Sequence, residues 1–115
     1  MCEMARVYSC VMRKARRAHR CCECRGTIEP GEIYHYHKGI WDDGPASYKV
    51  CYDCEKLRKD LDNGVKYEDV TPFEGLWDSV DGASADNPAV ARMWIAILEK
   101  RGQEVPVWLE QRGQL

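Results

Sequence analysis

The chain has 115 residues, which is enough for one domain and too few for two domains of ordinary size. Hydrophobic residues make up 44% of it and charged residues 31%, and no apolar run approaches the roughly 20 residues that a membrane helix needs. The first residues also lack the apolar segment and cleavage site of a secretory signal. We therefore expect a single domain over residues 1–115, in a cytoplasmic protein without membrane contact.

The net charge of −2 conceals an uneven distribution of charge along the chain. Residues 1–25 carry seven basic and two acidic side chains, whereas residues 61–115 carry five basic and ten acidic ones. A basic segment therefore precedes an acidic carboxy-terminal half. The basic side chains of interest are Arg13, Lys14, Arg16, Arg17, Arg20 and Arg25.

The first third of the chain predicts short strands and a loop. Ala5–Met12 is rich in β-branched and aromatic residues and predicts a strand, which the basic run Arg13–Arg20 follows. Cys21–Gly31 predicts a tight loop, because glycine and proline interrupt it repeatedly.

The next segment predicts a β-hairpin. Glu32–Lys38 alternates in the manner of a half-buried strand, Asp42–Pro45 predicts a turn, and Ala46–Val50 predicts the returning strand. His35 and His37 share one face of the first strand. Because the sequence shows no nearby carboxylate or thiol to complete a metal site with them, we expect both histidines at the surface.

The remainder of the chain predicts helices. A helix should run from Tyr52 to a stop at Asn63 and Gly64, and a second should begin at the capping residue Thr71. A longer amphipathic helix should run from Asn87 to Gly102, followed by a turn or two over Pro106–Arg112. The apolar helical patterns place three tryptophans in the core, namely Trp77, Trp94 and Trp108.

Four cysteines form the strongest motif in the sequence. Cys21 and Cys24 are separated by two residues, as are Cys51 and Cys54, and 26 residues lie between the pairs. In a reducing compartment this spacing is typical of a structural zinc site with four thiolate ligands, because each short turn can direct two sulfurs at one ion. We therefore predict one structural Zn²⁺.

The sequence leaves alternatives open at this site. Cys22 or His19 could replace one ligand, although Cys22 is too close to Cys24 to form the usual turn with it. A redox-active iron ion would accept the same four thiolates. The lone residues Cys2 and Cys10 are typical of buried or bystander cysteines rather than ligands.

The residues around the cysteines resemble a group of small zinc proteins encoded by bacteriophages and prophages. The resemblance covers about residues 13–62 and rests on Cys21-x-x-Cys24, Gly31-Glu32, Gly39-x-Trp41-Asp42 and Cys51-x-x-Cys54. It is similar more broadly to treble-clef fingers, which implies an α+β fold with a zinc-binding turn, a hairpin and a helix. The predicted helices of residues 65–115 would form an extension packed on this zinc module.

The same resemblance suggests no enzymatic activity. Treble-clef nucleases need a histidine on the helix that follows the hairpin, and no histidine occurs after His37. Four protein ligands would also leave no open position on the ion for water.

With enzymatic activity set aside, the sequence favours two binding functions. The resemblance to phage proteins implies binding of a host protein complex, for example as an anti-defence or anti-CRISPR inhibitor, and the acidic tryptophan-bearing half favours this interpretation. The alternative is nucleic-acid binding by the basic side chains between Arg13 and Arg25.

Overall fold

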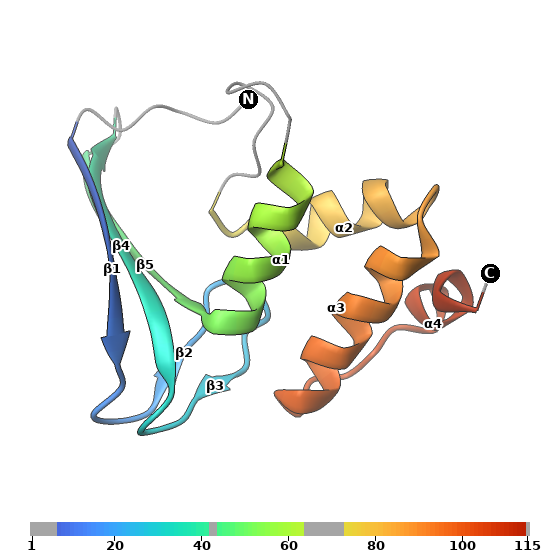
Figure 1. Ribbon diagram of the computed structural model, residues 1–115, viewed down its shortest axis with the longest axis horizontal. Helices are drawn as coiled ribbons and strands as arrows, with labels where there is room; N and C mark the ends of the chain where they lie inside the picture. The colour runs from blue at the N-terminus through green and yellow to red at the C-terminus, as the bar shows by residue number, and fades with distance from the viewer. Residues whose placement is uncertain (1–6, 42–43, 64–72, 115) are drawn as a thin grey trace.

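The computed structural model describes residues 7–41, 44–63 and 73–114, and places a sheet beside a layer of helices (Figure 1). A three-stranded antiparallel sheet is formed by β1 (Val7–Lys14), β4 (Ile33–Trp41) and β5 (Gly44–Cys51), and β2 (His19–Arg20) pairs with β3 (Thr27–Ile28). The helices are α1 (Tyr52–Asp62), α2 (Leu76–Ser84), α3 (Pro88–Lys100) and α4 (Val107–Gly113). The predicted α+β class is confirmed.

The sheet has the order β1-β4-β5, so that the hairpin strand β4 lies in the middle. β1 extends two residues beyond the predicted strand and includes Arg13 and Lys14, which pair with Tyr34 and Ile33 of β4. The basic run therefore starts on the edge strand of the sheet. Of the predicted hairpin turn, Asp42 and Asp43 lie outside the described residues, and Gly44 already belongs to β5.

The two histidines of β4 are buried, and their predicted surface position is wrong. The exposed fraction is 7% for His35 and 2% for His37. The reason is that α1 packs against β4 and brings Glu55 to within 2.8 Å of His37, so that this face of the sheet is an interior one. A histidine beside a carboxylate tolerates burial far better than an unpaired one.

The helix predicted to begin at Thr71 begins later, at Leu76. Thr71 lies outside the described residues, and Glu74 has a positive φ of 68°, which interrupts helical geometry just before α2. The first free amide of the helix, that of Leu76, donates to the buried carboxylate of Glu23 at 3.2 Å. A residue of the first cysteine turn therefore stabilises the start of α2.

The other helices begin and end close to their predicted limits. Asn87 caps α3 by accepting a hydrogen bond from the Ala89 amide at 3.1 Å, and Gly102, with φ of 70°, follows the end of α3. The apolar stripe of this helix buries Trp94 completely. Trp108 is wrongly predicted as core, because α4 leaves 38% of it exposed.

The helical half is attached to the sheet half by a buried arginine. The side chain of Arg101, at the end of α3, is only 4% exposed and lies 2.8 Å from Glu32 and 3.5 Å from Asp53. The aliphatic part of Arg101 packs on Gly26, whose α-carbon has no room for a methyl group: a β-carbon there would lie 2.3 Å from Arg101 Cβ. The contact thus depends on glycine at this position.

Candidate metal centre

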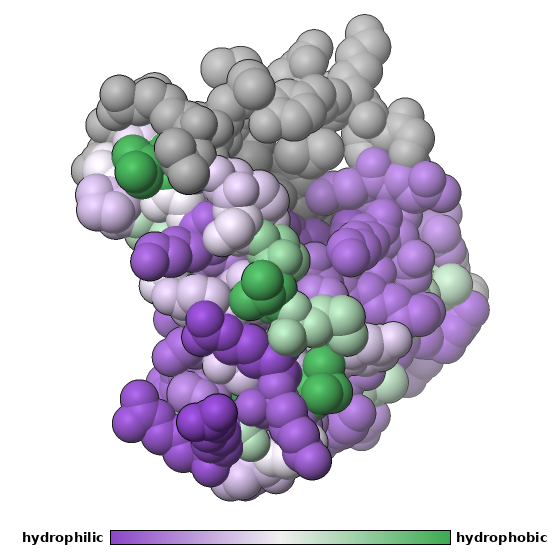
Figure 2. Space-filling model, turned by 60° about the vertical axis from the view of Figure 1, so that its left-hand side comes forward, coloured by the Kyte–Doolittle hydropathy of each residue, from purple (hydrophilic) through white to green (hydrophobic). Residues whose placement is uncertain are grey.

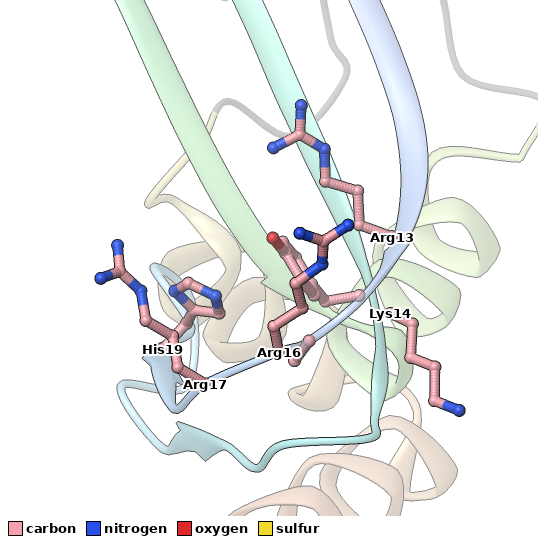
Figure 3. Close-up of a pocket in the computed structure, with 7 residues that line it drawn as sticks. Arg13, Lys14, Arg16, Arg17 and His19 are labelled. Carbon is pink, nitrogen blue, oxygen red and sulfur yellow. The ribbon is translucent and has the colours of Figure 1, made fainter.

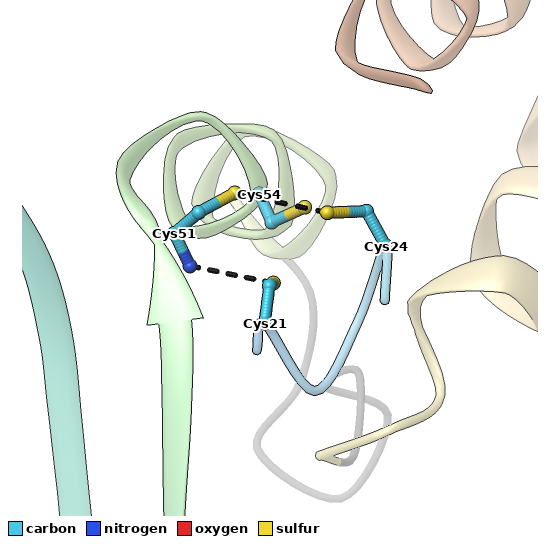
Figure 4. Close-up of side chains that lie close together, drawn as sticks. All are labelled: Cys21, Cys24, Cys51 and Cys54. Atoms are coloured by element: carbon cyan, nitrogen blue, oxygen red, sulfur yellow. Dashed lines mark hydrogen bonds between the residues drawn. The ribbon is translucent and has the colours of Figure 1, made fainter. Parts of the chain in front are cut away.

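Four cysteine side chains converge at the point where the sheet meets α1 (Figure 4). Cys21 and Cys24 lie on the turn after β2, Cys51 is the last residue of β5, and Cys54 lies in the first turn of α1. All four are at most 1% exposed. The turn, the hairpin and the start of the helix therefore supply the two cysteine pairs in the order that the sequence predicts.

The sulfur positions fit a tetrahedral ion. The four sulfurs lie within 4.8 Å of one another, and Cys24 Sγ is 4.0 Å from Cys51 Sγ. A tetrahedron with metal–sulfur distances of about 2.3 Å has edges of about 3.8 Å. Among the residues that the structure describes, this is the only group of ligand atoms that meets this mutual distance. The cluster could hold one metal ion.

Backbone amides support the sulfurs from within the turn. The amides of Glu23 and Cys51 donate to Cys21 Sγ at 3.4 and 3.3 Å, and the amide of Gly26 donates to Cys24 Sγ at 3.4 Å. Arg25 has a positive φ of 65°, which lets the chain close the turn. Hydrogen bonds of this kind stabilise thiolate rather than thiol.

The contacts among the four thiols shift their pKa values in opposite directions. Hydrogen bonds from the thiols of Cys24, Cys51 and Cys54 lower the pKa of Cys21 far below its ordinary value. The same contacts, chiefly that with Cys21, raise the pKa of Cys54. Four buried sulfurs cannot all be charged next to one another, so the cluster favours a cation that neutralises them.

The other predicted ligand candidates lie outside the cluster. Cys22 is half-buried and does not belong to the cluster, and burial raises the pKa of its thiol. His19 lies against the Tyr34 ring and 3.3 Å from Lys49 Nζ. Cys2 lies outside the described residues, and the cysteines that the structure describes are all unpaired thiols. Cys21, and not Cys22, belongs to the cluster.

Four of the six predicted basic residues surround one hollow of about 1010 Å³ (Figure 3). Its lining comprises Arg13, Lys14, Ala15, Arg16, Arg17, His19 and Tyr34. The guanidinium groups of Arg13 and Arg16 point into the same region, Arg17 lies beside His19, and Lys14 extends away from them. We refer to Arg13, Lys14, Arg16 and Arg17 as the basic surface.

Arg20 and Arg25 do not belong to the basic surface. Neither lines the hollow, and Arg25 lies 3.8 Å from Glu74 at the start of the helical half. One part of the predicted basic segment therefore faces its own acidic half.

A second cluster of polar side chains was missed by sequence reasoning. Cys10 Sγ lies 3.9 Å from both His35 Nδ1 and His37 Nε2, and Glu55 contacts the same His37 nitrogen. The expectation that no thiol or carboxylate lies near these histidines is wrong. The signal available in the sequence was the alternation of His35 and His37, but the pairing of β1 with β4 that brings Cys10 opposite His37 was not predicted.

Burial sets the protonation of this cluster. It lowers the pKa of His35 and raises that of Cys10, so both groups favour their neutral forms. Burial also raises the pKa of Glu55, but the hydrogen bond from His37 outweighs it and the net shift is downward.

Comparison of the chain with protein-family models, with curated proteins and with solved structures gave no match. Among the described residues, no helix has both the length and the apolar character needed to cross a bilayer.

Proposed function

We propose that this protein is a non-enzymatic module, built around a structural Zn²⁺, that binds nucleic acid through its basic surface. Zinc fits the cluster because four thiolates in a closed tetrahedron are its common structural coordination, and because it is redox-silent. Cys21, Cys24, Cys51 and Cys54 would occupy every position on the ion. Its role would then be to hold the turn, the hairpin and α1 together.

The observation that carries nucleic-acid binding is the grouping of the basic surface around one hollow. Arg16 and Arg17 are exposed and follow directly on the edge strand, whose position the sheet fixes. Tyr34 and His19 add aromatic rings beside the cations, a combination that suits phosphates and stacked bases. Figure 2 shows one face of the molecule that is largely hydrophilic, with its hydrophobic side chains in a stripe near the middle.

Salt dependence of binding tests this proposal. Fluorescence anisotropy with single-stranded and duplex oligonucleotides over a range of salt concentrations should show affinity that falls steeply with salt. Replacing both Arg16 and Arg17 by alanine should weaken binding and reduce the slope of log affinity against log salt by about two.

The double variant Arg20→Ala, Arg25→Ala is the matched control, since it removes the same charge outside the hollow. It should retain most of the affinity. Absence of binding at low salt would contradict the proposal, as would equal losses in the two double variants.

A second candidate is binding of a host protein complex, with the chain encoded by a phage and serving as an anti-defence or anti-CRISPR inhibitor. The order of cysteine turn, hairpin and helix supports kinship with treble-clef phage proteins. Exposure of 67% for Val107 and 38% for Trp108 on α4 favours a protein-binding surface on the helical half. Recovery of one bacterial complex by the wild type, but not by Val107→Asp, Trp108→Ala protein, would support this function over the first.

A further inference from the structure

We propose that Cys10, His35 and His37 form a second site for a divalent transition-metal ion, with the Glu55 carboxylate as the fourth ligand. The site is separate from the four-cysteine cluster and independent of the proposed nucleic-acid binding. It belongs to the interior face of the sheet, where β1 and β4 meet α1.

Strand geometry brings the three ligands from β1 and β4 together. His35 and His37 are two residues apart and therefore project from the same face of β4, and Cys10 lies directly opposite His37 in the antiparallel pair. The histidine pair and the cross-strand thiol therefore place three possible ligands on the same face of the sheet. α1 closes the group from the other side with Glu55, whose side chain is 5% exposed.

The distances around the sulfur are close to those of a coordinated ion. Cys10 Sγ is 3.9 Å from His35 Nδ1 and 3.9 Å from His37 Nε2. In a tetrahedral zinc site, sulfur and nitrogen ligands are about 3.6 Å apart. The two imidazole rings lie nearly parallel, with centroids 6.3 Å apart, so the His35 side chain would have to rotate toward His37 for both histidines to reach one ion.

The remaining nitrogen of His37 is already oriented by a hydrogen bond. Tyr8 Oη lies 2.5 Å from His37 Nδ1. The carboxylate of Glu55 accepts a hydrogen bond from His37 Nε2, so Nε2 carries the proton and the Tyr8 hydroxyl donates to Nδ1. An ion at Nε2 would displace this proton, and the imidazole would then donate from Nδ1 to the Tyr8 oxygen, which can also accept. Metal-binding histidines are generally held in this way by a second hydrogen bond.

The cluster can supply two negative charges to a divalent cation and is open to solvent. One thiolate and one carboxylate would offset the two positive charges of the ion, which would compete for Glu55 with Arg58 at 3.8 Å and Lys59 at 4.0 Å. Cys10 is exposed, and a hollow of about 280 Å³ reaches the cluster from outside. Its lining is Met12, His35, Tyr52, Glu55, Lys56 and Lys59. An ion could therefore enter without unfolding of the sheet.

The competing interpretation is a packing cluster in which His37 and Glu55 form a buried ion pair. It predicts the same hydrogen bonds but no affinity for metal. Metal stoichiometry separates the two interpretations, because the four-cysteine cluster contributes one equivalent in either case.

The experiment loads purified protein with excess Zn²⁺, removes loosely bound metal by gel filtration, and measures zinc per chain by elemental analysis. The wild type should retain two equivalents. Cys10→Ser and His35→Ala should each retain one, and His19→Ala, which changes a histidine outside both clusters, should retain two. Circular dichroism of Cys10→Ser should match the wild type, since this side chain is exposed on an edge strand.

Two results would overturn the proposal. One is a wild type that retains no more zinc than Cys10→Ser after loading. The other is a second equivalent that survives in both Cys10→Ser and His35→Ala. Co²⁺ provides an independent readout, because a mixed sulfur, nitrogen and oxygen site should add visible bands to the all-sulfur spectrum, and these bands should vanish in His35→Ala but not in His19→Ala.

Discussion

Single side chains decide how closely the two halves of this molecule approach each other. Gly26 lies in the cysteine turn, and Arg101 lies at the end of α3. The space between them excludes even one methyl group, since a β-carbon on Gly26 would lie 2.3 Å from Cβ and 2.9 Å from Cγ of Arg101. Because Cβ is fixed to the backbone, rotation of the arginine side chain cannot relieve this overlap.

Gly26→Ala should therefore lower the free energy of unfolding by about 1–3 kcal/mol, the usual cost of overpacking. Urea unfolding measures the change. Gly82→Ala is the control, because Gly82 lies in α2 with nothing within 4 Å of a β-carbon, and it should be neutral or stabilising by up to about 1 kcal/mol. A Gly26→Ala protein as stable as the wild type would show that α3 can move away from the turn at little cost.

Tyr8 reports on the polar cluster between the sheet and α1. Burial, together with the nearby Cys10 and Glu55, raises the pKa of its phenol to about 12. In the folded protein the phenol therefore keeps its proton at a pH where an unfolded tyrosine, with a pKa of about 10, has lost it. The contribution of Tyr8 to stability is complete below pH 10 and falls as pH rises from about 10 to 12.

Phenolate absorbance measures this titration. The difference between wild-type and Tyr8→Phe protein should rise with a midpoint near pH 12, and near pH 10 once both proteins are unfolded in urea. A midpoint near 10 in the folded protein would mean that Tyr8 does not contact the His37 cluster.

At the scale of elements, the end of α3 is attached to the start of β4 and to α1 by one arginine. Arg101 lies 2.8 Å from Glu32 and 3.5 Å from Asp53 and is 4% exposed, whereas its neighbour Lys100 also lies 2.8 Å from Asp53 but is 59% exposed. Desolvation makes the buried cation far more dependent on its partners than the exposed one.

Arg101→Met should lower the free energy of unfolding by about 2 kcal/mol, because it leaves two partly buried carboxylates without their partner. Lys100→Met should change the same quantity by less than about 1 kcal/mol. Urea unfolding of the two variants gives the comparison. Similar losses in both would argue that general charge attraction, and not the buried contact, attaches the helix.

The starts and ends of the helices show which of them local sequence signals are sufficient to predict. The Asn87-Pro88 start of α3 and its stop at Gly102 are local in sequence, and both were predicted. The start of α2 was not, because it depends on Glu23, which is 53 residues away in the chain. A helix start that is stabilised by a side chain distant in sequence cannot be predicted from the residues around it.

At the scale of the whole molecule, the sequence predicted the cysteine cluster but not the histidine cluster. Paired cysteines at a fixed spacing specify their own geometry, since two short turns need only a hairpin to bring them together. The histidine cluster depends on which strand lies beside β4 and on where α1 packs, and both are long-range outcomes of packing. Of the basic segment, the sequence identified the residues, and the fold separated those around the hollow from Arg20 and Arg25.

The central claim, that four cysteines hold one structural zinc, is tested most directly by metal content. The variant Cys10→Ser removes a ligand of the proposed second site, so elemental analysis of this protein, purified without chelators, reports on the four-cysteine cluster alone. We predict one zinc per chain, and loss of this zinc with loss of the cooperative unfolding transition when Cys51→Ser is added. Well under one equivalent of zinc in Cys10→Ser, or iron in its place, would contradict the claim.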